Sequence, residues 1–203
     1  MSEATQRTYH HGDLRQALLD RAAEVIQTRG IEALSLRGLA RDLNVSHGAP
    51  NRHFRSKADL LTAIATEGYT QLIEATLSAA DNGDSDPWIR LNAMGQGFLH
   101  WALENPARFN TTMHPDLALY ESTELKNAME EFRLTIKEAV AATQSSGRHP
   151  EEDLEILNLF TISVPMGAAM LLAQRNESND LGNRDKLVAD LIELVVPIKD
   201  RLK

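Results

Sequence analysis

The sequence contains no cysteine. This absence excludes disulfide bridges, cysteine nucleophiles and metal sites built on thiolates. The sequence also lacks an uninterrupted apolar run approaching ~18 residues, and residues 1–9 are polar rather than signal-like. We therefore expect no membrane span and no secretory signal. Together with the missing cysteine, which suits a reducing compartment, this predicts a cytoplasmic protein.

An overall positive charge, the usual mark of a nucleic-acid binder, is absent as well, since the formal net charge is −8. The charge is unevenly distributed, however. Residues 1–60 contain nine Lys or Arg and seven Asp or Glu, a balance of +2. Residues 61–203 contain twelve basic and twenty-two acidic residues, a balance of −10. An acidic body with a mildly basic head suits a protein that touches DNA with one end only.

What the sequence does contain is a helical pattern along nearly its whole length. Apolar residues recur at spacings of three and four, and no segment alternates as a strand does. The pattern predicts an all-α protein with an N-terminal domain at residues 9–65 and a larger C-terminal domain at residues 66–203. The predicted helices cover residues 13–29, 35–43, 46–54, 56–80, 87–104, 106–113, 115–143, 150–174 and 183–196.

Capping residues mark the ends of several predicted helices. Asp13 is the expected N-cap of the first helix, and Gly30 is its expected left-handed stop. Ser56 and Asp59 have the spacing of a capping box. The dipeptide Asp86-Pro87 combines a cap with a proline in the first helical turn.

Residues 35–54 have the spacing of a helix-turn-helix. Two short helices that cross steeply need a small residue at the crossing, a turn residue that tolerates left-handed geometry, and an apolar residue that anchors the turn. Ala40, Asn44 and Val45 occupy these positions. The next helix, with Ser46 as its expected N-cap, would place its first turn against base edges in the major groove.

Short segments in the same region match a known pattern: Tyr-His-His-Gly-Asp-Leu at 9–14, Leu-Arg-Gly-Leu-Ala at 36–40, Asn-Val-Ser at 44–46, His-Phe-Arg-Ser-Lys at 53–57 and Leu-Leu at 60–61. Through them the chain resembles the TetR family of transcriptional regulators. The resemblance covers nearly all of the first 65 residues. It implies an all-α homodimer, two recognition helices facing successive major grooves, and a C-terminal helical domain that binds a ligand and dimerises.

The resemblance also implies which residues contact DNA. Base readers would begin the recognition helix, while Arg37 and Lys57 would hold phosphates from the starts of the second and fourth helices. Asn51 stands where the family usually has tyrosine, and an asparagine can bond bidentately to adenine, a pairing worth roughly 1–3 kcal/mol. The full predicted set is Arg37, Ser46, His47, Gly48, Ala49, Asn51, Arg52, His53 and Lys57.

Several of these residues have a structural alternative. Arg37 is also consistent with a solvated surface charge, and His53 with a histidine that merely packs at a helix end. The small side chains of Gly48 and Ala49 suit close approach to DNA and equally suit no contact at all. His10 and His11 have no third ligand nearby, so we expect no metal site.

The last two predicted helices, residues 150–174 and 183–196, are strongly apolar. By resemblance they pair with their mates in a four-helix dimer interface. Alternatively, they cover the core of a monomer. We favour the homodimer, because a single helix-turn-helix offers few contacts for specific binding.

Aromatic and methionine residues gather between residues 91 and 114. Trp-Ala-Leu-Glu-Asn-Pro at 101–106 weakly resembles a motif in the C-terminal domain of a TetR subgroup. The alternative to a pocket wall is plain core, which such residues at helical spacing commonly form. The predicted ligand-binding residues are Phe98, Trp101, Phe109 and Met113.

Together these observations predict a ligand-responsive transcriptional regulator that binds duplex DNA and a small-molecule effector and needs no cofactor. By analogy with the family's commonest mode, it would be a repressor that releases a palindromic operator on binding the effector. A helical enzyme is the first alternative, with His100 and Glu104, or His114 and Asp116, as acid–base pairs. No nucleophile motif, phosphate loop or metal-ligand spacing accompanies those pairs. A helical adaptor without DNA or ligand is the second alternative.

Overall fold

The computed structural model describes residues 11–81, 85–115, 117, 122–173, 186, 188 and 190–192, and no strand occurs among them. The predicted all-α class is confirmed. The elements are α1 (His11–Arg29), the 3₁₀ turn η1 (Ile31–Ala33), α2 (Leu36–Asp42), the 3₁₀ turn η2 (Pro50–Arg52), α3 (Lys57–Ala80), α4 (Pro87–Glu104), α5 (Pro106–Thr112), α6 (Thr123–Ser145) and α7 (Leu154–Ala173).

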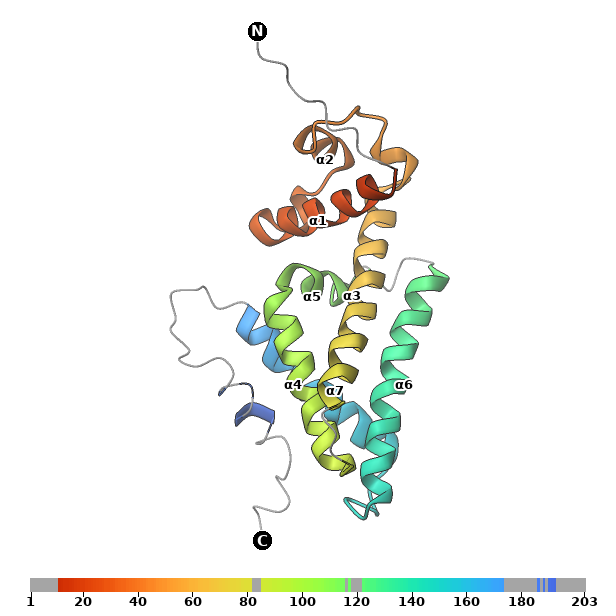
Figure 1. Cartoon of the computed structure of the whole chain (residues 1–203), viewed down its shortest axis with the longest axis vertical. Coiled ribbons are helices and arrows are strands. Elements are labelled where there is room, and N and C mark those ends of the chain that lie inside the picture. The colour runs from red at the N-terminus through yellow and green to blue at the C-terminus, as the bar shows by residue number, and fades with distance from the viewer. Residues whose placement is uncertain are drawn as a thin grey trace.

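The helices form a small head and a larger body that share α3. Figure 1 shows α1, α2 and the first turns of α3 as the head, with the rest of α3 running down into a body that also contains α4 to α7. Two apolar cores correspond to these parts, and they meet on α3, where Ile64 belongs to the head cluster and Ala65 to the body cluster. The domain boundary at residue 65 stays a prediction, since α3 continues through this residue without interruption.

Side-chain caps account for most helix starts. The Ser35 hydroxyl accepts from the Gly38 amide at 3.1 Å, and the Ser56 hydroxyl accepts from the Asp59 amide at 3.0 Å. The Asp86 carboxylate accepts from the amide of Trp88 at 2.8 Å. These satisfy N–H groups that have no partner inside the helix.

The predicted cap at Asp13 is wrong. Helix α1 begins at His11, so Asp13 already lies within the helix. One good capping residue does not fix a helix start when the residues before it are also compatible with a helix. Gly30, in contrast, ends α1 with φ of 80°, as predicted.

The predicted third helix, residues 46–54, is wrong as an α-helix. The structure has turns followed by the single 3₁₀ turn η2. The cause is Pro50, which lacks the N–H that would bond to the carbonyl of Ser46 in an α-helix. That carbonyl accepts instead from the amide of Ala49 at 2.9 Å, and the amide of His53 bonds to the carbonyl of Pro50, also at 2.9 Å. This i to i+3 pattern defines a 3₁₀ turn.

The predicted start of the long helix at residue 115 is also wrong, because α6 begins only at Thr123. The Ser122 hydroxyl caps α6 by accepting from the Leu125 amide at 3.2 Å. Before it, Leu117 is buried in the body and its amide bonds to the carbonyl of His114 at 3.1 Å in a short turn.

Helix α7 begins at Leu154 rather than at residue 150. Of the predicted last helix, residues 186, 188 and 190–192 are described and helical, and the others lie outside the described residues.

Helices α3 and α4 approach so closely that Gly97 has no room for a side chain. A Cβ atom at this position would lie 2.6 Å from the carbonyl oxygen of Ala75 and 2.7 Å from the Cβ of Ala79. The first of these is a backbone atom, which cannot rotate away. Gly97 therefore sets the distance between the two helices that contribute most of the body core.

We predict that Gly97→Ala destabilises the protein. Overpacking a close helix contact costs roughly 1–3 kcal/mol, and each kcal/mol lowers the melting temperature of a chain of this size by about 2–4 °C. Thermal unfolding followed by circular dichroism measures the shift. Gly48→Ala is the matched control, since nothing lies within 4 Å of a Cβ there; an equal shift in both variants would contradict the packing argument.

Candidate DNA-binding head and ligand cavity

The turn of the helix-turn-helix is built as the spacing predicts. Asn44 has a left-handed φ of 53°, and Ala40 is fully buried where α2 meets the core. Val45 packs against the head cluster, and its amide donates to the carbonyl of Ala40 at 2.9 Å. The three predicted roles are confirmed, and the segment after the turn therefore emerges in a fixed direction.

Ion pairs fasten α2 to α1. The Arg21 guanidinium donates two hydrogen bonds to the Asp42 carboxylate, at 2.8 and 3.0 Å, and Arg29 lies 3.6 Å from the same carboxylate. Hydrogen bonding from Arg21 holds the pKa of Asp42 below its usual range. These groups are largely solvated, so their contribution is mainly to the orientation of α2 rather than to stability.

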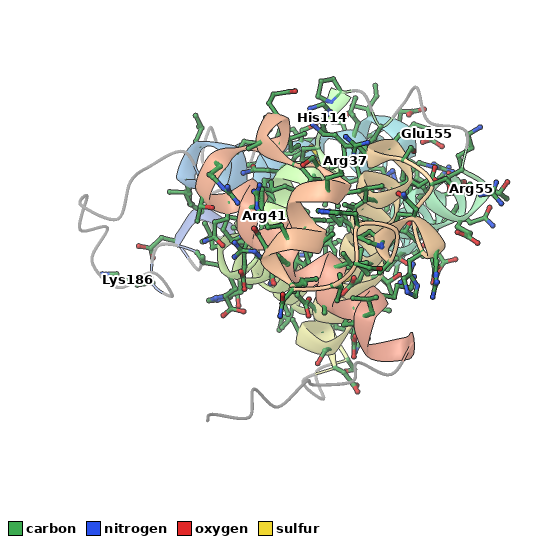
Figure 2. All side chains as sticks on the ribbon, turned by 90° about the horizontal axis from the view of Figure 1, so that it is seen from above. Arg37, Arg41, Arg55, His114, Glu155 and Lys186 are labelled. Atoms are coloured by element: carbon green, nitrogen blue, oxygen red, sulfur yellow. The ribbon has the colours of Figure 1, made fainter. Side chains whose placement is uncertain are left out.

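The predicted DNA-contacting residues lie mostly on the surface of the head. Figure 2 looks down onto the head end of the molecule and shows Arg37 near the centre of that face. The exposed members of the predicted set are Arg37, Ser46, His47, Gly48, Asn51 and Arg52, while Ala49, His53 and Lys57 are half-buried. None of these residues is fully buried, so all of them are placed where a ligand outside the head can reach at least part of the side chain.

Lys57 and Gly48 are both open to a partner. The Lys57 ammonium is 3.8 Å from the carboxylate of Glu32, whose side chain is 94% exposed, so this ion pair is weak and solvated. Gly48 has no atom within 4 Å of a Cβ position and has no positive φ. Nothing in the described fold therefore requires a glycine at residue 48.

His53 is held by the fold itself. The centroid of its ring lies 6.5 Å from that of the Phe54 ring. The Arg15 guanidinium lies over the Phe54 ring, 5.5 Å from the centroid. The Nε2 atom of His53 is buried and has no hydrogen-bond partner in the described part of the chain. This position favours the structural alternative for His53.

Sequence reasoning passed over two exposed arginines of the head, Arg41 and Arg55. Arg41 is in the last turn of α2, with a side chain that is 75% exposed, and Arg55 directly precedes the capping box of α3. Both are labelled in the view of the head in Figure 2. Arg55 lies within the matched segment at 53–57 but was assigned no contact there, and Arg41 directly follows the matched segment at 36–40.

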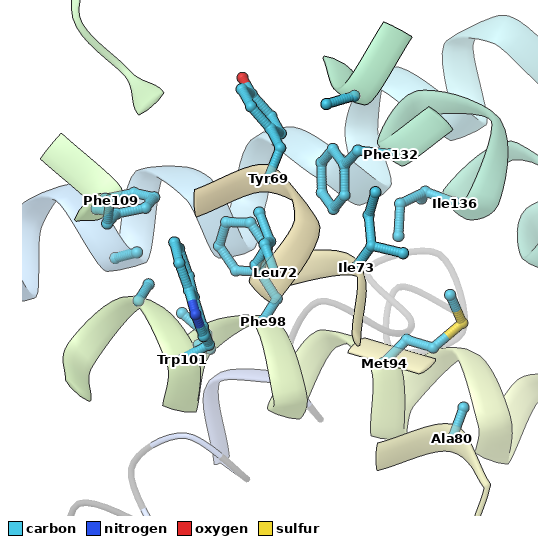
Figure 3. Close-up of a cluster of buried hydrophobic side chains, with 14 of the residues drawn as sticks. Tyr69, Leu72, Ile73, Ala80, Met94, Phe98, Trp101, Phe109, Phe132 and Ile136 are labelled. Atoms are coloured by element: carbon cyan, nitrogen blue, oxygen red, sulfur yellow. The ribbon is translucent and has the colours of Figure 1, made fainter. Parts of the chain in front are cut away.

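Three of the four predicted ligand-binding residues are part of the body core. Phe98, Trp101 and Phe109 are buried, and Met113 packs against the same cluster. Figure 3 shows Phe98 between Phe109 and Phe132, with its centroid 6.1 Å from each of the two rings. The indole Nε1 of Trp101 is buried and finds no acceptor among the described residues.

A narrow apolar cavity opens beside this core. It has an outer chamber of about 90 Å³ and an inner chamber of about 30 Å³, which share Leu91, Gly95, Thr161 and Pro165. The inner chamber reaches Phe98, the one predicted ligand residue that lines it. Sequence reasoning missed the other lining residues, because they come from scattered positions on α4, α6 and α7, from the loop before α7 and from Ile192.

The outer chamber carries the polar groups of this cavity. Asn92 and His149 line it together with Trp88, and the Arg148 guanidinium lies 4.6 Å from the centroid of the Trp88 ring. His149 has a left-handed φ of 52°, and the Gln144 amide bonds to the carbonyls of His149 and Glu152, at 3.1 and 2.7 Å. The cavity is thus apolar inside and polar at one end, as ligand sites commonly are.

A larger hollow, about 960 Å³, lies between the head and the start of α6, but it is an open and largely polar groove lined by Arg15, Glu67 and Glu124, among others. Among the described residues, no group of three His, Asp or Glu side chains could hold a metal ion.

Helix α7 is the one described helix that is long and apolar enough, by length and composition, to cross a membrane. The segment Leu154–Leu172 has a mean hydropathy of 1.6, but only 17% of its apolar window is buried. Asn158, Thr161 and Ser163 interrupt the apolar run, which is why sequence reasoning found no run of membrane length. The exposed apolar side chains of α7 are Ile156, Leu159, Phe160, Met170 and Leu171.

Comparison with known families and proteins agrees with this geometry. Residues 18–64 match the family of bacterial regulatory proteins, tetR family. Residues 91–195 match the tetracyclin repressor-like C-terminal domain. The matched domains are those of DNA-binding regulators rather than of enzymes.

Two relatives match part of the chain. The HTH-type transcriptional regulator Rv1816 of Mycobacterium tuberculosis is 33% identical over 81 residues, which span 39% of this chain and 35% of that protein. The HTH-type nicotine-responsive transcriptional repressor HdnoR of Paenarthrobacter nicotinovorans is 35% identical over 90 residues, 44% of this chain and 45% of that protein. The matched region thus spans less than half the length of either relative.

Solved structures share the fold over nearly the whole chain, as two of them illustrate. A protein of unknown function from Rhodococcus sp. RHA1 has a TM-score of 0.78 at 28% identity, covering 94% of this chain and 97% of that one. The regulator FadR from Bacillus subtilis, solved with stearoyl-CoA, has a TM-score of 0.74 at 15% identity. The match covers 90% of this chain and 97% of FadR. At that identity FadR shows the fold alone.

Proposed function

The chain belongs to the TetR family of bacterial transcriptional regulators, and we propose that it is a homodimeric repressor whose release from a two-fold-symmetric operator is controlled by a small apolar molecule. The observation that carries the proposal is the head itself. A helix-turn-helix with a rigid turn presents an exposed basic and polar surface at one end of an acidic molecule.

The DNA contact follows from the direction of the segment after the turn. After the turn at Asn44, residues 46–48, 51 and 52 are exposed while Ala49 and Pro50 pack on the head. Gly48 allows a phosphate or base edge to approach the backbone. Arg37 and Lys57 flank this segment from the starts of α2 and α3. The helix dipole places a partial positive charge at the N-terminus of α3. This charge and the Lys57 ammonium would attract a phosphate together.

We predict that the double substitution Arg37→Ala, Lys57→Ala weakens binding to a duplex that the wild-type protein selects from a random library. Each lost phosphate contact lowers affinity and reduces the salt dependence of binding by about one unit of slope. Titration by fluorescence anisotropy at several salt concentrations measures both effects.

The matched control is Arg133→Ala, Lys137→Ala, which removes an arginine and a lysine from ion pairs with Glu130 and Glu155 on the body. Unchanged affinity and slope in the head variant would refute the assigned contacts. If the wild-type protein selects no sequence at all, the proposed function itself is wrong.

Dimerisation is supported by the exposed face of α7. Five large apolar side chains on one helix are exposed in the single chain, and an apolar face of this kind is usually covered by a partner. The head has a charge balance of only +2, so joining two heads would add much of the affinity that charge alone does not provide. A second copy, rather than a membrane, is the proposed occupant of this face.

We predict that Leu159→Glu converts a dimer into a monomer, because it places a carboxylate in an apolar contact. Sedimentation velocity without detergent measures the mass. Leu77→Glu on α3, where the leucine is also exposed, should leave the dimer intact. A wild-type protein that sediments as a monomer, or that is recovered only with lipid, would contradict the proposal.

The effector is proposed to enter the cavity between α4, α6 and α7. The inner chamber is lined almost entirely by apolar side chains, with Thr161 as its polar member, which suits a compact apolar molecule with its polar end toward Asn92 and His149. Two relationships support an effector: the relative HdnoR is a nicotine-responsive repressor, and the same fold accommodates stearoyl-CoA in FadR.

We predict that Thr161→Leu fills the cavity and abolishes the response to ligands without weakening DNA binding. Straight-chain alcohols and carboxylic acids of increasing length serve as probes. A molecule that binds only the folded state raises the melting temperature, and it should do so in the wild-type protein but not in the variant. Thr135→Leu on α6, outside the cavity, is the control. Equal stabilisation of both variants would place the effector elsewhere.

A further inference from the structure

Helix α5 belongs to both cores at once. Ala107 is part of the head cluster, whereas Phe109 is part of the body cluster. Figure 1 shows this short helix directly beneath α1 and beside α3. Arg108 lies between these two residues, so its backbone is at the junction of head and body.

The Arg108 guanidinium bridges two carboxylates from different helices. Its Nη2 atom lies 2.9 Å from Asp20 on α1 and 3.3 Å from Glu67 on α3. The Gln16 amide also donates to both carboxylates, at 3.2 and 3.4 Å. The Arg108 side chain is only 18% exposed, so the arginine end of this contact is largely shielded from solvent.

Helix α5, which carries Arg108, is closely packed against α3. Gly68 lies against α5 so closely that a Cβ there would be 2.8 Å from the Thr112 methyl group. The buried Tyr69 hydroxyl donates to the Thr112 carbonyl at 3.5 Å, and burial raises the pKa of Tyr69, which keeps it a donor. The position of the Arg108 backbone is thus set by the packing of α5 on α3.

The two carboxylates differ in exposure. The Glu67 side chain is 24% exposed and also accepts from the Gln71 amide at 2.9 Å, whereas Asp20 is 52% exposed. The bond to Glu67 therefore anchors Arg108 to α3. The more solvated bond to Asp20 adds a polar contact between α5 and α1 to the apolar contact that Ala107 makes with the head cluster.

Arg108 is also connected to the cavity through one ring contact. Phe98 lines the inner chamber and meets Phe109 edge-to-face, with ring centroids 6.1 Å apart and planes at 90°. Phe109 is the next residue after Arg108 on α5. This ring contact therefore joins the wall of the cavity to the helix that carries Arg108.

We propose that Arg108 is the positioning residue that fixes the orientation of the head on the body, through its bond to Asp20. This inference rests on the proposed function, because orientation matters only if two heads must match two half-sites of one operator. In a dimer whose heads are fixed, the distance between the two recognition segments is fixed as well. Such a dimer binds tightly only to operators whose half-sites have the matching separation.

The experiment measures spacing selectivity with Arg108→Met, which removes the charge and keeps the length of the side chain. The duplex selected by the wild-type protein is compared with duplexes that have one or two base pairs inserted between the half-sites. We expect the wild-type protein to lose affinity steeply on insertion. The variant should bind the original duplex roughly ten-fold more weakly and lose much less on insertion, because its heads are free to reorient.

Three further variants separate positioning from simple destabilisation. Asp20→Asn removes only the exposed partner and should relax spacing in the same way, while Arg108→Lys should restore strict spacing. Arg133→Met, which breaks an arginine ion pair on the body, should change nothing. Melting temperatures within about 4 °C of the wild type confirm that the variants fold.

The outcomes are distinguishable. If the wild-type protein selects no two-fold-symmetric duplex, the proposed function fails before Arg108 is tested. If it does, and Arg108→Met and Asp20→Asn keep the wild-type penalty for insertions, the role assigned to Arg108 is overturned.

Discussion

The structure depends on one continuous helix, α3, that contributes side chains to two separate apolar cores. Its first two turns close the head, and from Ala65 onward it forms the centre of the body. Head and body consequently cannot move independently without bending or rolling this helix. The close approach of α4 at Gly97 and of α5 at Gly68 fixes α3 from two sides. These contacts fix α3 within the body, and the proposed bond between Arg108 and Asp20 then fixes how the head is oriented on it.

Much of the head could be predicted from sequence, because its structure is determined by local chemistry. The left-handed residue at Asn44 and the capping hydroxyls at Ser35 and Ser56 act on residues at most four positions away. Pro50 shows where such reasoning stopped: its missing N–H replaces the predicted helix at residues 46–54 with turns and a 3₁₀ turn. The family resemblance predicted a set of DNA-contacting residues without revealing that change.

The cavity and the Arg108 contact were not predictable in this way, because both join residues far apart in the chain. Arg108 and Asp20 are 88 positions apart, and neither residue belongs to a recognisable motif. The cavity walls come from α4, α6, α7, the loop before α7 and Ile192, so no spacing rule brings Thr161 to Leu91 or His149 to Trp88. The aromatic set found from sequence is mainly core, and it borders the cavity only through Phe98. Long-range packing decides such features, and single-sequence patterns do not encode it.

The central claim is that two copies of this chain bind one operator through two heads held at a fixed separation. The most direct measurement is the mass of the complex with the selected duplex, combined with a footprint of the same complex. The account predicts two chains per duplex and two protected half-sites about one helical turn, or a small multiple of it, apart. A single chain protecting one half-site, or a complex with no two-fold symmetry in its footprint, would contradict it.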